Sequence, residues 1–206
     1  MNNETLRERL KKGDFKDIEN WDVSKVTDMH YLFAGIRHFN QDISRWDVSK
    51  VTNMYRMFYN AVSFDQDIDS WDISNVTDVS GMFQHAIAFN QDVGSWDTSN
   101  VEDMAFMFFG AVSFNQDVGS WDVSNVTNMS GMFGYAASFN QYIDDWDVSN
   151  VTNMRGMFHH AVSFNMRIKS WNVSYRTDIL YMFAGVIKFY NLLRAWRAWR
   201  AWKSRL

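Results

Sequence analysis

The chain has 206 residues, of which 47% are hydrophobic and 17% aromatic, enough apolar material for one buried core or one continuous repeat array. Its net charge of −4 gives no excess of positive charge, which argues against nucleic-acid binding. The absence of cysteine excludes disulfides and cysteine-ligated zinc. No apolar run is long enough to cross a bilayer and the N-terminus does not resemble a signal peptide, so we expect neither a transmembrane segment nor a leader.

The first element that the sequence predicts is a short helix at the N-terminus. Residues 4–12 are amphipathic, with Leu6 and Leu10 one helical turn apart, and Gly13 follows where a helix often ends. We therefore expect residues 1–13 to form a capping helix that covers the apolar edge of the structure that follows.

A 25-residue repeat dominates the rest of the sequence. Tryptophan recurs without any change of register at Trp21, Trp46, Trp71, Trp96, Trp121, Trp146 and Trp171. The unit reads roughly W-D-V-S-N-V-T-N-M-S-x-M-F-x-x-A-x-x-F-N-Q-D-I-x-x. A repeat of this length is typical of units that bury their apolar faces only by stacking on their neighbours, so residues 14–190 are predicted to form seven stacked coils.

Each unit is predicted to contain one short helix and one short strand. Val51, Met54, Met57, Phe58 and Ala61 are spaced by three and four residues, as on the buried face of a helix. Ser49 stands at the expected N-cap. Before it, Trp46 and Val48 alternate with polar residues as they would in a strand.

The motif I-x-x-W-D-V-S-N, followed by V-T-x-M-x-x-M-F, resembles the L-x-x-L-x-L-x-x-N frame of leucine-rich repeats. It resembles more closely the BspA-like repeats of bacterial surface proteins, over about residues 15–190. The resemblance implies an α/β fold, a right-handed leucine-rich-repeat-like solenoid. Its members are adhesion or interaction proteins with secretion or lipid-anchoring signals. The resemblance suggests a cell-surface location, although neither signal is visible in this sequence.

Polar residues also recur in columns. The aspartate after each tryptophan, as in Asp47, is predicted to point outward, and adjacent carboxylates would repel by roughly 0.9 kcal/mol in water. Two interpretations account for the column: each carboxylate accepts hydrogen bonds from the serine two residues on, or the column binds calcium or a repetitive partner. The candidate binding residues on this edge are Arg45, Asp47, Ser49, Asp72, Ser74, Asp97, Ser99, Asp122, Ser124, Asp145, Asp147 and Ser149.

The remaining columns favour structural roles. The tryptophan, methionine and phenylalanine columns are interpreted as core, and the asparagine column that begins at Asn40 is interpreted as a ladder that ties loop backbones together. The five histidines occupy slots that vary between coils, which argues against a metal site or a catalytic triad. No nucleophile, phosphate-loop or metalloprotease motif is present, so we expect no enzymatic activity and no cofactor.

Residues 191–206 are basic and rich in tryptophan. Three interpretations stay open for this tail: a cap on the last coil, an anchor to a membrane surface or an anionic partner, and an artefact of repeat slippage. The candidate contact residues in the tail are Arg194, Trp196, Arg197, Trp199, Arg200 and Trp202.

The sequence thus favours a non-enzymatic repeat module that binds a protein or polysaccharide partner through an exposed face. The alternative is a structural or assembly component anchored by its tail to a membrane or an acidic scaffold. The partner and the oligomeric state do not follow from the sequence.

Overall fold

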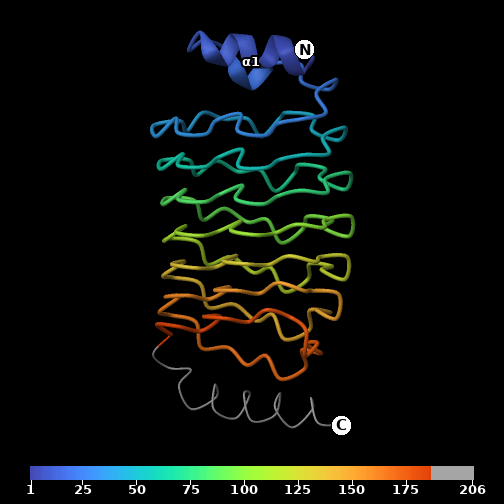
Figure 1. Cartoon of the computed structure of the whole chain (residues 1–206). Helices are drawn as coiled ribbons and strands as arrows, with labels where there is room; N and C mark the ends of the chain where they lie inside the picture. Colours follow the sequence, from blue (N-terminus) through green and yellow to red (C-terminus); the bar gives the residue numbers. More distant parts are fainter. Residues whose placement is uncertain (187–206) are drawn as a thin grey trace.

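A computed structural model describes residues 1–186, and Figure 1 shows them as a helix, α1, lying across one end of a stack of similar coils. In these residues the helical elements are α1 (Asn3–Lys11) and a short 3₁₀ helix, η1 (Ile18–Asn20). We count each coil from its tryptophan. The leucine-rich-repeat class and the right-handed winding stay predictions.

Helix α1 forms where the sequence predicted it. Asn2 is its N-cap and accepts a hydrogen bond from the Thr5 amide at 2.9 Å, while the Asn2 amide donates to the Thr5 hydroxyl at 3.0 Å. Leu6 and Leu10 are buried, and Gly13 has a positive φ of 67° just after the helix. The predicted helix is confirmed.

The coils themselves consist of turns rather than the predicted helix and strand. The segment 55–60 is a run of turns, and the backbone pairing between neighbouring coils is a single parallel bridge, such as the one between Asn53 and Asp78. The reason is a left-handed backbone at two positions in every coil, as at Arg56 and Asn60, whose φ angles are 51° and 56°. A right-handed helix cannot continue through such residues.

Backbone amides in the turn segment alternate between two kinds of partner. The amides of Met54, Arg56, Phe58 and Asn60 donate to carbonyls of the next coil, at 2.8–2.9 Å. The amides between them close turns within the coil, as from Met57 to the Met54 carbonyl at 3.1 Å. Because a helix would use all these amides internally, the turns leave half of them to join the stack.

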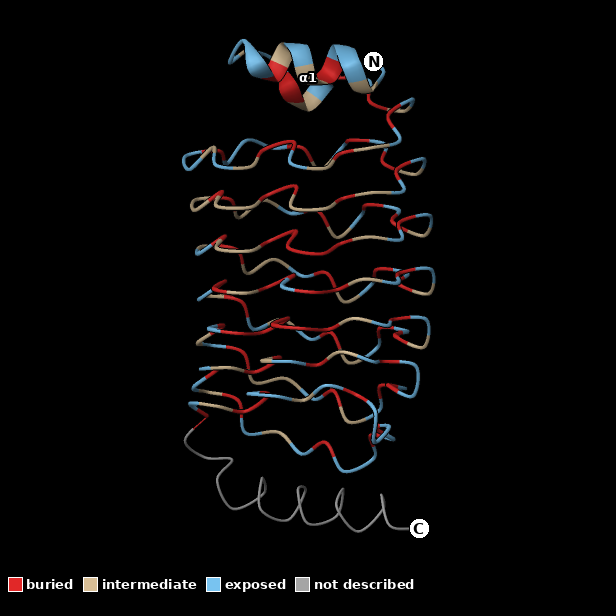
Figure 2. Cartoon of the chain, viewed as in Figure 1, coloured by how far each residue is buried: buried red, intermediate tan, exposed pale blue. Residues whose placement is uncertain are grey.

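The core is a set of aromatic and aliphatic columns that run through the stack, and Figure 2 shows that every described coil contains buried stretches. The rings of Phe58 and Phe83 stack with centroids 5.5 Å apart and planes 5° apart, and Phe58 also stacks on Phe64 of its own coil at 3.9 Å. The interpretation of the tryptophan, methionine and phenylalanine columns as core is confirmed.

Polar groups, both buried and exposed, form hydrogen bonds between coils that recur along the stack. The indole of Trp71 donates to the Ile43 carbonyl at 3.2 Å. In the asparagine column the side-chain oxygen of Asn115 accepts a hydrogen bond from the backbone amide of Asn140 in the next coil at 2.8 Å. In the same column the Asp65 carboxylate accepts one from the backbone amide of Asn90 at 2.9 Å. The predicted asparagine ladder is confirmed.

Candidate binding surface

The aspartate column predicted from the sequence lies on one exposed edge of the stack. Each of its carboxylates accepts a hydrogen bond from the amide of the serine two residues on, for example Asp47 from Ser49 at 3.1 Å. In three coils the serine hydroxyl also donates at 2.6 Å. The predicted Asx-type bonding is therefore confirmed. The structure places the candidate binding residues on this edge as follows: exposed Arg45, Asp47, Asp72, Asp97, Asp122, Asp145, Asp147 and Ser149, and half-buried Ser49, Ser74, Ser99 and Ser124.

We call the surface formed by this aspartate column the acidic edge. The hydrogen bonds to serine explain why its carboxylates stay charged although they lie close together. The Ser49 hydroxyl and amide hold the pKa of Asp47 below its usual value, and Ser149 does the same for Asp147. The charged form is thus favoured by local hydrogen bonds that each coil makes with itself. The edge has a structural explanation that requires no ligand.

Two other sequence predictions concern metals and the tail. Within residues 1–186 no group of three or more histidine, aspartate or glutamate side chains could hold a metal ion. The tail residues Arg194, Trp196, Arg197, Trp199, Arg200 and Trp202 lie outside the described residues.

A second surface follows the left-handed turn positions, which form two columns along the stack. The first column holds Tyr31, Arg56, Gly81, Phe106, Gly131, Gly156 and Tyr181, and the second holds Gly35, Asn60, His85, Gly110, Tyr135, His160 and Gly185. We call these columns, with the residue that precedes each member, the turn face. Glycine is the residue of lowest cost at a positive φ, whereas a bulky side chain there is strained.

The large side chains of the turn face occupy space that glycines leave open in the next coil. A Cβ atom built on Gly131 would lie 2.5 Å from Cε1 of Phe106, and one built on Gly81 would lie 2.8 Å from Cγ of Arg56. The rings of His85 and His160 lie in the same way against Gly110 and Gly185. Each of these four residues, Arg56, His85, Phe106 and His160, therefore rests on the glycine of the coil that follows.

Aromatic contacts connect these side chains across coils. The ring of Tyr135 stacks on His160 with centroids 5.0 Å apart and planes 18° apart, and meets Phe109 edge-on at 5.3 Å. Phe106 and Tyr135 remain 38% and 43% exposed, so their rings are held in place and still accessible to solvent.

The turn face contains no aspartate or glutamate at any position between residues 30 and 185. Its arginines have partners: the Arg56 guanidinium lies 5.2 Å from the ring centroids of Tyr55 and Tyr59, and Arg155 lies 3.8 Å from the Asp178 carboxylate. The surface thus carries aromatic side chains and no carboxylates, in contrast to the acidic edge.

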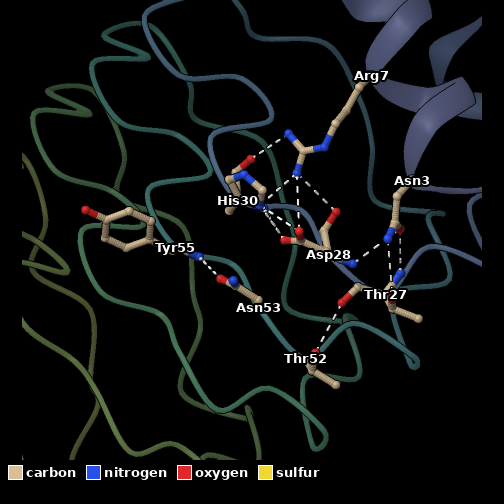
Figure 3. Close-up of polar contacts among 8 residues, drawn as sticks. All are labelled: Asn3, Arg7, Thr27, Asp28, His30, Thr52, Asn53 and Tyr55. Atoms are coloured by element: carbon tan, nitrogen blue, oxygen red, sulfur yellow. Dashed lines mark hydrogen bonds and ion pairs between the residues drawn. The ribbon is translucent and has the colours of Figure 1, made fainter.

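At its N-terminal end the turn face meets α1. Figure 3 shows Arg7 reaching from the helix to the first coil, where it donates to the His30 carbonyl at 2.9 Å and lies 3.8 Å from Asp28. Burial raises the pKa of Asp28, but hydrogen bonds from His30 and the charge of Arg7 outweigh it and hold the pKa below its usual value. A hollow of about 400 Å³ opens here, lined by Lys11 and Tyr31 among others.

Sequence reasoning missed the turn face because its residues differ from coil to coil. The signal that could have revealed it was the exchange of glycine with large residues in one slot, as at Gly81, Phe106 and Gly131. That exchange marks a positive φ, since glycine alone adopts it freely.

Comparison with known proteins agrees with the repeated architecture. The sequence matches the protein family described as "Mycoplasma protein of unknown function, DUF285" in two overlapping segments, residues 3–117 and 88–196. No curated protein and no solved structure matches the chain. Among residues 1–186, no helix has the length and apolar character needed to cross a membrane. Since the two segments together span nearly the whole sequence, the chain belongs to this repeat-containing family of unknown function.

Proposed function

We propose that this protein is a non-enzymatic binding module that contacts a macromolecular partner through the turn face. The observation that carries the proposal is the presence of large, exposed side chains at left-handed positions where glycine would fold at lower cost. Phe106, Tyr135 and Tyr181 have φ angles of 57°, 56° and 59°. Strained residues kept on one surface are typical of functional sites.

The acidic edge is the weaker candidate for a contact surface. Its carboxylates are already bound by serines of the same coil, and the arrangement recurs because each coil needs it. The turn face, by contrast, differs in every coil, as a surface that recognises a particular partner does.

The resemblance to BspA-like surface repeats supports the proposal, because members of that family are adhesion or interaction proteins. We extend the proposal to a cell-surface location and to a right-handed leucine-rich-repeat-like winding. A stack of this kind offers a long, rigid surface rather than a closed pocket, which suits binding better than catalysis.

The test is affinity capture with three immobilised baits: the intact chain, a turn-face variant and an acidic-edge variant. The turn-face variant carries Phe106→Gly, Tyr135→Gly and Tyr181→Gly, which copy glycines found in the same columns. The acidic-edge variant carries Asp47→Asn and Asp147→Asn. We expect the intact chain and the acidic-edge variant to retain a partner that the turn-face variant loses. Loss only with the acidic-edge variant, or no partner with any bait, contradicts the proposal.

A further inference from the structure

We infer that the turn face binds an uncharged linear polysaccharide, whose pyranose rings stack on Phe106, Tyr135 and Tyr181. This inference rests on the proposed function and names the chemical class of the partner.

Neighbouring side chains hold the rings of Tyr135 and Tyr181 in place, and all three aromatic side chains remain partly exposed to solvent. Tyr135 lies on the ring of His160, which in turn lies against Gly185 of the last described coil. Tyr181, 58% exposed, has the Arg155 guanidinium 5.5 Å from its ring centroid. An aromatic face is electron-rich, so it attracts the polarised C–H groups on the flat side of a sugar ring.

The charge of the turn face favours a neutral ligand. Arg56 is held over the tyrosine rings and Arg155 lies beside Asp178, so neither is a free cation. Burial lowers the pKa of both His85 and His159, which keeps these two imidazoles neutral near pH 7. A ligand that carries many charges would find no set of unpaired opposite charges here.

The turn face also contains a hydrogen-bond acceptor without a partner. The side-chain oxygen of Gln84 is buried and has no hydrogen-bond partner among the described residues. A built Cβ on Gly81 would lie 3.2 Å from it, so this oxygen sits beside the first left-handed column. An unsatisfied acceptor is costly, and a small rotation of the amide would offer it to a ligand hydroxyl.

The repeat of the stack suits a chain of sugars. Side chains in one column recur with the spacing of adjacent β-bridged segments, about 4.8 Å. One pyranose unit advances a polysaccharide by a similar distance. Phe106 and Tyr135 lie in adjacent coils and Tyr181 lies two coils further on, so a linear glycan lying along the stack needs at least four units to reach all three.

Isothermal titration calorimetry tests this inference. The full chain is titrated with neutral hexasaccharides of β-1,4-glucose, α-1,4-glucose, β-1,4-mannose and β-1,4-N-acetylglucosamine, and with hexagalacturonate as the acidic counterpart. We expect at least one neutral hexasaccharide to bind, more tightly than hexagalacturonate, with an affinity that changes little between low and high salt. Loss of one stacking ring should weaken binding by about tenfold.

Three variants locate the binding. Phe106→Gly and Gln84→Met should both reduce the affinity, whereas Tyr142→Ser should not, because Tyr142 is an exposed aromatic residue outside the turn face. The inference is overturned if no neutral hexasaccharide binds, if hexagalacturonate binds equally well, or if Phe106→Gly leaves the affinity unchanged. If the sugars fail while the capture experiment yields a partner that needs the same rings, only the polysaccharide assignment falls and the proposed function stands.

Discussion

The ring of Phe106 fills the space in front of Gly131 in the next coil, and both residues have a left-handed backbone, with φ angles of 57° and 62°. The glycine thus serves two purposes, since it adopts the turn and makes room for its neighbour's side chain. Because of this contact, the shape of the turn face depends on which residues occupy the same position in adjacent coils.

Replacement of Gly131 by alanine should therefore destabilise the protein in two ways. The positive φ costs about 1–2 kcal/mol for a residue with a Cβ atom. The new methyl group would also displace Phe106. Gly156→Ala is the matched control, because its φ is also 62° but its built Cβ lies 3.7 Å from the nearest neighbour, Cβ of His159. Urea unfolding should show a larger loss for Gly131→Ala, and equal losses would contradict the contact with Phe106.

The asparagine ladder predicts a different pair of outcomes at residue 115. Asn115→Ala removes the acceptor for the Asn140 amide and should lower the free energy of unfolding by about 0.5–1.5 kcal/mol. Asn115→Asp keeps an acceptor, as Asp65 does in the same column, and should lose much less. Thermal and urea unfolding of both variants measure the difference, and an alanine variant as stable as the aspartate variant would argue against the ladder bond.

Asp103 should be a site where asparagine is more stable than aspartate at neutral pH. Burial raises the pKa of Asp103, and the nearby Asp78 carboxylate raises it further, although the Ala105 amide and the Asn128 side chain donate to it. Since the pKa in the folded state is raised, ionisation costs stability as the pH rises through the unfolded value of about 3.9. Asp103→Asn should raise the free energy of unfolding at pH 7, with the gain disappearing below about pH 4.

Asp147→Asn is the control for that experiment and should give the opposite sign. Hydrogen bonds from Ser149 lower the pKa of Asp147, so the carboxylate stabilises the fold above its unfolded pKa and loses this effect as the pH falls through its folded value. We expect Asp147→Asn to be less stable than the wild type at pH 7. If both asparagine variants shift stability in the same direction, the pKa assignments are wrong.

The capping role of α1 predicts the effect of truncating its buried side. Leu6 is fully buried against the first coil, so Leu6→Ala should lower the free energy of unfolding by about 2–5 kcal/mol. A loosened helix would also expose the apolar edge of the first coil and promote end-to-end association. Glu8→Ala, on the exposed side of α1, is the control. Unchanged stability of Leu6→Ala, with a monomer in sedimentation velocity, would show that the helix is not a cap.

The sequence predicted burial better than it predicted backbone conformation. Val51, Met54, Met57, Phe58 and Ala61 are all buried as their spacing indicated, yet the segment is not a helix. Tandem turns of three to four residues bury side chains with nearly the period of a helix, so periodicity alone does not separate the two. The distinguishing signal was glycine at recurring slots inside the supposed helix.

The two candidate surfaces also differ in how well the sequence predicted them. The acidic edge was predictable because one aspartate and one serine recur in every coil, and their hydrogen bonds follow from that spacing. The turn face was not, because the contact between Tyr135 and His160 depends on residues from two coils whose backbones both adopt a rare conformation. Only the folded chain brings such residues together.

The claim that binding, rather than folding, maintains large side chains at left-handed positions is tested by the urea unfolding of the Phe106→Gly, Tyr135→Gly double variant. Relief of strain, about 1–2 kcal/mol per residue, should offset the loss of two partly exposed rings and the greater freedom of glycine in the unfolded chain. We predict a free energy of unfolding within about 1 kcal/mol of the wild type. A loss of more than about 3 kcal/mol would contradict the claim, because the rings would then be required for the stack itself.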